Sequence, residues 1–166
     1  MNRATIIALI GILVLGPSLP ARAADASALV GTWQISGFSV VDLNTNETSR
    51  PFGEHPIGYL QYSPGGHVLV FLTSGEQVRP SGTVAYTDAE RAAIHKSIFG
   101  AYSGTYRVDG NAVTHHVISS WRPEWVGTDV VRYFEIDGKK LTLKTAPAIS
   151  AAGQRIVATL TFERIE

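Results

Sequence analysis

From residue 31 onward, short apolar stretches are separated by turn signals at intervals typical of an antiparallel all-β domain. The pattern predicts eight strands, at residues 31–41, 57–63, 67–73, 102–109, 112–120, 129–136, 139–145 and 155–165. Eight strands in an up-and-down order form a closed barrel, whose interior is filled by side chains or holds one small ligand. The predicted fold class is therefore an all-β, eight-stranded antiparallel barrel.

Three pairs of consecutive strands are separated by short turn sequences. Pro64-Gly65-Gly66 predicts a tight turn, and Gly110-Asn111 and Asp137-Gly138 predict two-residue hairpin turns. Because the turn fixes the register of a hairpin, these signals also assign each strand residue to the inner or the outer face.

One helix is expected. Residues 87–90, Thr-Asp-Ala-Glu, form a capping-box sequence at which the helix would begin. We expect it to run to about Phe99 and to stop at Gly100, since glycine is favoured just after a helix. Ile94 and Ile98 share one helical face, which predicts that the helix leans on the barrel.

The first 23 residues have the features of a secretory signal peptide. Arg3 precedes an apolar segment at residues 6–15, and Ala21-Arg22-Ala23 fits a small-x-small cleavage site. The apolar segment is shorter than the about 20 residues that span a bilayer. We expect a leader at 1–23 and an exported domain at 24–166, in the periplasm or secreted, with an uncleaved anchor as the alternative.

Composition narrows the function classes. The full chain has 14 basic and 14 acidic residues, and loss of Arg3 and Arg22 with the leader leaves 12 − 14 = −2. This charge predicts no nucleic-acid partner and no stable membrane anchor after cleavage. The chain has no cysteine, so about 140 mature residues must be stabilised by their core alone. No nucleotide, flavin or nicotinamide fingerprint occurs, and no cofactor is expected.

Gly31, Trp33 and Arg164 form a predicted structural set. Glycine two residues before a tryptophan lets the backbone pack beside a large indole, which would plug one end of the barrel. If Arg164 stacks on Trp33, the first and last strands are neighbours and the sheet closes on itself.

Several segments in order resemble the lipocalin-like domain family of bacteria and fungi, within the wider calycin group. The segments are residues 29–33 (LVGTW), 51–53 (PFG), 56–60 (PIGYL), 62–67 (YSPGGH), 104–106 (GTY), 114–116 (THH), 125–128 (WVGT) and 162–164 (FER). The resemblance covers nearly all of the mature chain. It implies a closed eight-stranded barrel with one open end and a central cavity, and it implies no particular substrate.

The alternation of faces predicts which side chains line that cavity. With Gly110-Asn111 as the turn, Tyr106 lies opposite His115 and Tyr102 opposite Ser119, on the face of the strand valines. Arg132 shares the inner face of its hairpin with apolar residues. An unpaired buried arginine is unfavourable, and no acidic residue is predicted on the inner face, so an anionic ligand, water or tyrosine hydroxyls would be its partner.

Two further residues join the candidate site. Tyr59 and Tyr62 point to opposite faces of their strand, and we assign Tyr59 to the cavity. Trp121 belongs to a segment that forms either a lid over the mouth or a packed corner. The predicted ligand-binding residues are Tyr59, Tyr102, Tyr106, His115, Ser119, Trp121 and Arg132.

An apolar wall with a few polar groups is typical of a small-molecule site. The sequence favours a barrel that binds a small hydrophobic or amphipathic molecule bearing an anionic or carbonyl group. The alternatives are an isomerase, cyclase or hydrolase in which His115 and Tyr106 perform acid–base chemistry, and a packed barrel that acts as an interaction module. A metal site is not expected, because His115 and its outward-facing neighbour His116 cannot aim at one ion.

Overall fold

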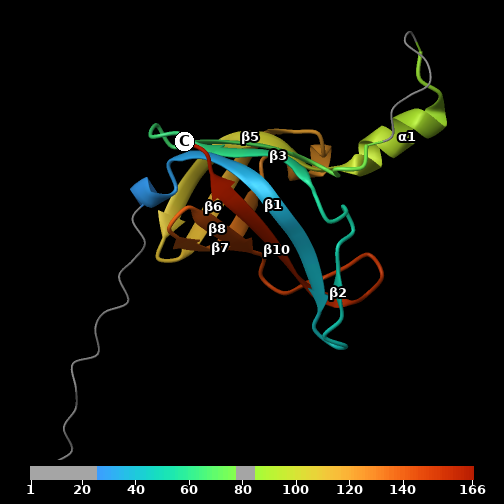
Figure 1. Cartoon of the computed structure of the whole chain (residues 1–166). Helices are drawn as coiled ribbons and strands as arrows, with labels where there is room; N and C mark the ends of the chain where they lie inside the picture. The colour runs from blue at the N-terminus through green and yellow to red at the C-terminus, as the bar shows by residue number, and fades with distance from the viewer. Residues whose placement is uncertain (1–25, 78–84) are drawn as a thin grey trace, which may run out of the picture.

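The computed structural model of the chain describes residues 26–77 and 85–166; the predicted leader and its cleavage site lie outside these residues. One antiparallel sheet contains the strands in the order β2-β1-β3-β4-β5-β6-β7-β8-β10-β9, and β1 also pairs with β10. Eight long strands therefore form a closed barrel (Figure 1). They are β1 (Gly31–Asp42), β3 (Ile57–Tyr62), β4 (His67–Thr73), β5 (Ile98–Asp109), β6 (Ala112–Ser120), β7 (Asp129–Asp137), β8 (Lys140–Lys144) and β10 (Arg155–Arg164).

Short elements complete the fold. β2 (Thr48–Ser49) and β9 (Ala148–Ile149) are two-residue strands that pair with the far ends of β1 and β10. Two 3₁₀ turns, η1 (Ala26–Ala28) and η2 (Pro123–Trp125), flank the barrel strands. The predicted strands thus correspond to the eight long ones.

The first and last strands meet where the sequence places Trp33 and Arg164. These residues are directly paired, and the Arg164 guanidinium lies 4.0 Å from the centre of the indole ring. The Trp33 indole N–H donates to the Leu29 carbonyl at 2.8 Å, and Arg164 donates to the carbonyls of Val30 and Ala28. The stacked pair therefore ties the segment before β1 to the end of β10 and closes this end of the barrel.

Gly31 is required by the same contact. Its φ is +136°, and a Cβ at this position would lie 2.4 Å from the Glu166 carbonyl oxygen and 2.6 Å from an Arg164 nitrogen. Only glycine combines this backbone conformation with such a close approach. The glycine before the tryptophan thus makes room for the arginine.

The hairpin of β5 and β6 has the predicted residue pairing next to its turn but not at the end far from the turn. Tyr106 pairs with His115, as expected from Gly110-Asn111. Beyond this point Ile118 forms a β-bulge in β6, so Tyr102 pairs with Ser120 and not with Ser119. One extra residue on a strand reverses the faces of all that follow. Ser119 is therefore exposed on the outer surface, and its assignment to the inner face is wrong.

The hairpin of β7 and β8 shows a smaller shift. Asp137 pairs with Lys140, so the two-residue turn is Gly138-Lys139, one residue later than predicted. The shift changes the partner of Phe134 from Leu141 to Leu143, but the inner face is unchanged, because Leu141 and Leu143 lie on the same face of β8.

The helix begins as predicted and ends early. In α1 (Asp88–Ser97) the capping box is formed, with the Thr87 hydroxyl accepting from the Glu90 N–H at 3.2 Å. Ile98 begins β5, where it pairs with Thr73. Gly100 therefore lies in a strand, and the predicted extension of the helix to Phe99 is wrong.

The predicted docking of this helix on the barrel is also wrong. No residue of α1 is buried, and Figure 1 shows the helix projecting from one end of the barrel. Ile98, which would have completed an apolar stripe with Ile94, belongs to the sheet. One aromatic contact joins α1 to the segment after β6: the His95 and Trp121 rings lie 4.3 Å apart.

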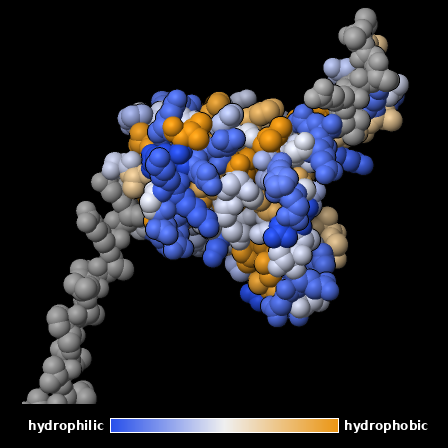
Figure 2. Space-filling model, viewed as in Figure 1, coloured by the Kyte–Doolittle hydropathy of each residue, from blue (hydrophilic) through white to orange (hydrophobic). Residues whose placement is uncertain are grey.

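The outside of the barrel is mixed in character. Figure 2 shows hydrophilic residues over much of the visible face, with apolar residues in small groups between them. Within residues 26–77 and 85–166, no helix has the length and apolar character needed to cross a membrane.

We predict that Arg164→Lys lowers the free energy of unfolding by roughly 2 kcal/mol, because lysine loses the planar stack on Trp33 and one of two charged hydrogen bonds. Urea unfolding measures the change. Arg155→Lys is the control, since this exposed arginine begins the same strand and its change is expected within about 0.5 kcal/mol. Equal stabilities of the two variants would contradict a role of Arg164 in closing the barrel.

Candidate functional site

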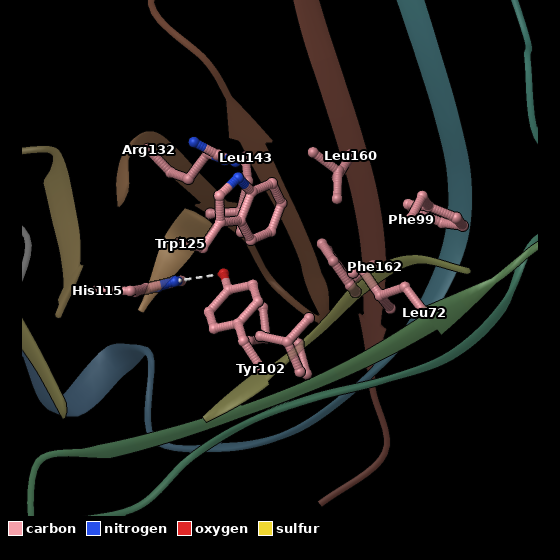
Figure 3. A pocket seen from close by; sticks show the side chains of 12 residues that line it. Leu72, Phe99, Tyr102, His115, Trp125, Arg132, Leu143, Leu160 and Phe162 are labelled. Carbon is pink, nitrogen blue, oxygen red and sulfur yellow. Dashed lines mark hydrogen bonds between the residues drawn. The ribbon is translucent and has the colours of Figure 1, made fainter. Parts of the chain in front are cut away.

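The barrel encloses a cavity of about 40 Å³. Its wall is mostly apolar and comes from strands on all sides of the barrel (Figure 3). The twelve lining residues are Leu60, Val70, Leu72, Phe99, Gly100, Tyr102, His115, Trp125, Arg132, Leu143, Leu160 and Phe162. The wall therefore contains three hydrogen-bonding side chains besides the indole, and none of the twelve is acidic.

His115 is the most buried of the polar residues, with 1% of its surface exposed. Its Nδ1 lies 2.7 Å from the Tyr102 hydroxyl, and its Nε2 lies 2.8 Å from the Tyr62 hydroxyl. Burial, with a smaller contribution from the positive charge of Arg132, lowers the pKa of His115 to about 3. The imidazole is therefore neutral at physiological pH, and both ring nitrogens have a tyrosine partner.

Both tyrosines are protonated at the same pH. Burial raises the pKa of Tyr102 to about 12 and that of Tyr62 well above its usual value, although Arg132 opposes both shifts. Tyr62 is 1% exposed, and its ring meets that of His115 edge to face. The centre of the barrel thus holds a neutral cluster of two phenols and one imidazole.

Arg132 brings the one formal charge to the cavity wall. It lies on β7, is half-buried, and donates from one guanidinium nitrogen to the Val131 carbonyl at 2.8 Å. In the part of the chain that the structure describes, no carboxylate forms an ion pair with Arg132. The predicted inner position of Arg132 is observed, because Arg132 lines the cavity.

Aromatic side chains form part of the cavity wall and pack beside it. Trp125, in η2, meets the Tyr102 ring at 5.8 Å, and Figure 3 shows the Tyr102 hydroxyl between the His115 imidazole and the Trp125 indole. The Arg122 guanidinium lies 5.1 Å from the Trp125 ring. Phe99 stacks on Phe52 with ring centres 4.3 Å apart. Trp125 and Phe99 thus place two aromatic rings on the cavity wall.

The predicted assignment of Tyr59 to the cavity, and of Tyr62 to the opposite face, is wrong. Tyr59 is 49% exposed on the outer face, whereas Tyr62 is buried inside. Leu60 pairs with Trp33 on the inner face, so the alternation of β3 places Tyr62 inside and Tyr59 outside. Tyr106 is paired with His115 across the strands, but its hydroxyl donates to the Ser63 carbonyl at 3.0 Å.

Two more candidates lie away from the cavity. Ser119 belongs to an outer groove with Leu69 and Phe71, because of the β-bulge at Ile118 in β6. Trp121 borders the same groove and packs against His95 of α1. The residue of that segment that lines the cavity is Trp125. Neither Trp125 nor Tyr62 was among the predicted site residues, although the pairing of Leu60 with Trp33, had it been known, would have identified Tyr62.

Within the described residues, no three His, Cys, Asp or Glu side chains are grouped as they would be around a metal ion.

We predict that stability decreases on acidification because of His115. Its pKa is about 3 in the folded protein and near 6.5 when unfolded, so the unfolded state binds the extra proton between these values. The free energy of unfolding should fall from pH 6.5 to 4.5 by up to about 1.4 kcal/mol per pH unit. Denaturant unfolding at several pH values should show this slope in the wild type and in His67→Gln, an exposed control. His115→Gln should lose it, and an unchanged slope in that variant would contradict a buried neutral imidazole.

Comparison with known proteins agrees with this architecture. A search of curated proteins gives no significant match. The profile of the lipocalin-like domain family matches residues 30–165, which include every long strand of the barrel. The chain therefore belongs to the lipocalin-like domain family.

Proposed function

We propose that this protein is an exported carrier or receptor for a small, mostly apolar molecule with an anionic or carbonyl group, bound inside the barrel. A lipocalin-like barrel is suited to ligand binding in general. The observation that carries the finer proposal is Arg132, a cation on the wall of an apolar cavity without a carboxylate among the lining residues. The leader expected at residues 1–23 would export the barrel.

The polarity of the wall favours a hydrogen-bond acceptor as the ligand's polar group. A guanidinium only donates hydrogen bonds, and a half-buried guanidinium is stabilised by a negative partner. The surrounding leucine and phenylalanine side chains would hold the apolar part of the same molecule. A small organic acid satisfies both parts of the site.

The cavity limits the size of the ligand. Its volume of about 40 Å³ exceeds the roughly 10–15 Å³ that one water needs, so the barrel is not completely filled. It is smaller than the roughly 300 Å³ or more of common ligand pockets. We infer that this volume admits a carboxylate and little of its chain, and that the chain of an acid such as hexanoate displaces Trp125, whose short 3₁₀ turn has no buried residue.

The site gives less support to acid–base catalysis. A general base works best when its pKa lies near the working pH. Burial lowers the pKa of His115 to about 3, and Tyr106 is hydrogen-bonded to the backbone outside the cavity cluster. Binding is therefore the function that the geometry favours.

Calorimetry with hexanoate, hexanol and hexylamine tests the charge. We predict that hexanoate binds the wild type most tightly and that Arg132→Gln weakens its binding about tenfold or more, since a charged hydrogen bond contributes about 1.5–3 kcal/mol. Arg107→Gln is the matched control, because Arg107 is exposed on the neighbouring hairpin and pairs with Asp129. Equal hexanoate affinity in all three proteins, or preference for the amine, would overturn the proposal.

A second experiment tests the size limit. Trp125→Ala should raise affinity for octanoate and decanoate relative to butyrate, because it opens the wall of the cavity. Trp121→Ala removes the same side chain from the outer groove and should leave the chain-length preference unchanged. The same preference in both variants would show that Trp125 does not limit the ligand.

A further inference from the structure

The hydrogen bonds through His115 form a chain that has a direction. Tyr62, His115 and Tyr102 are joined at 2.8 and 2.7 Å, and each hydroxyl has its one hydrogen bond within the described residues to the imidazole. A neutral imidazole has one N–H and one acceptor nitrogen. One tyrosine must therefore donate to the ring, and the other must accept from it.

Two arrangements satisfy this chemistry. In the first, Tyr62 donates to Nε2, the Nδ1–H donates to Tyr102, and the Tyr102 proton is left over. In the second, Tyr102 donates to Nδ1, the Nε2–H donates to Tyr62, and the Tyr62 proton is left over. The arrangements differ in the place of the unused proton.

The surroundings of the two hydroxyls differ in a way that decides between them. Tyr62 is 1% exposed and is not among the residues that line the cavity, so an unused proton there would be buried without an acceptor. Tyr102 lines the cavity, where water or a ligand can accept its proton. An unsatisfied buried donor is costly, whereas a donor at a cavity is satisfied by its contents.

We infer that His115 carries its proton on Nδ1, that Tyr62 donates to Nε2, and that the Tyr102 hydroxyl donates into the cavity. The wall then presents two donors, the Tyr102 hydroxyl and the Arg132 guanidinium. These two donors indicate which polar group the ligand carries. This part of the inference rests on the proposed function. The ligand group is a carboxylate, with one oxygen accepting from Tyr102 and its charge facing Arg132.

The arrangement also gives the two tyrosines different roles. Tyr102 would touch the ligand and discriminate between an acceptor and a donor group. Tyr62 would donate to Nε2 of His115, so that the Nδ1–H faces Tyr102. The ring is held between two strands, with Tyr62 on β3 and Tyr102 on β5.

The first test is made without any ligand. Long-range ¹H–¹⁵N NMR of the histidine side chains distinguishes Nδ1–H from Nε2–H, and the signals of His115 are assigned by their loss in His115→Gln. We expect the Nδ1–H tautomer at pH 7. A predominant Nε2–H tautomer, or a charged ring, would overturn the inference, whether or not acids bind.

The second test compares two variants that each remove one hydroxyl from the same imidazole. Tyr102→Phe should weaken hexanoate binding about tenfold, because it removes one hydrogen bond to a charged group. Tyr62→Phe should change the binding by less than about threefold, because Tyr62 does not contact the ligand. Circular dichroism and thermal unfolding establish that both variants are folded. Equal losses in the two folded variants would overturn the donor role of Tyr102.

The two proposals can fail separately. If the wild type shows the Nδ1–H tautomer but binds no carboxylate, the proposed function and the ligand class fail while the hydrogen-bond direction stands. If carboxylates bind and Tyr102→Phe has full affinity, the proposed function stands and the inference fails.

Discussion

The pairing of β1 with β10 is the constraint on which the rest of the structure depends. Arg164 stacks on Trp33 and donates to carbonyls before β1, so the last strand holds the first in place. Closure turns one face of the sheet into an interior, where residues far apart in sequence meet. Tyr62 reaches His115 across 53 positions for this reason. The site is thus a consequence of barrel closure and not of any local motif.

Inside that barrel, burial determines the chemistry of the polar groups. Desolvation disfavours the charged forms of histidine and tyrosine, so the central cluster is neutral and is satisfied by its own hydrogen bonds. Arg132 is half-buried at the wall, where water or a ligand can reach its guanidinium. The proposed recognition of an anion rests on these two properties together.

Much of the fold could be predicted from the sequence, because strand alternation and turn residues are local signals. The pairing of Trp33 with Arg164 followed from one motif at each end of the chain. The errors arose where tertiary contacts override such signals. A β-bulge at Ile118 moved Ser119 outside, and strand pairing by Ile98 shortened the helix. The sequence around Ile118 carries no glycine or proline that would signal the bulge. Gly104 lies opposite it on β5, where a Cβ would lie 2.0 Å from the His116 carbonyl oxygen.

The candidate site was predicted in part, for a related reason. Alternation placed His115, Tyr102 and Arg132 inside, but the face of an isolated strand such as β3 is ambiguous until its partner is known. The choice of Tyr59 over Tyr62 therefore could not be made from the sequence, and Trp125 lies in a 3₁₀ turn without any alternation.

A crystal structure of the wild-type protein with bound hexanoate tests the central claim most directly. We predict a carboxylate oxygen within hydrogen-bond distance of the Tyr102 hydroxyl, the carboxylate facing Arg132, and the alkyl chain against the leucines of the wall. A ligand bound in the reverse direction, with its alkyl end at Tyr102 and its carboxylate in solvent, would contradict it.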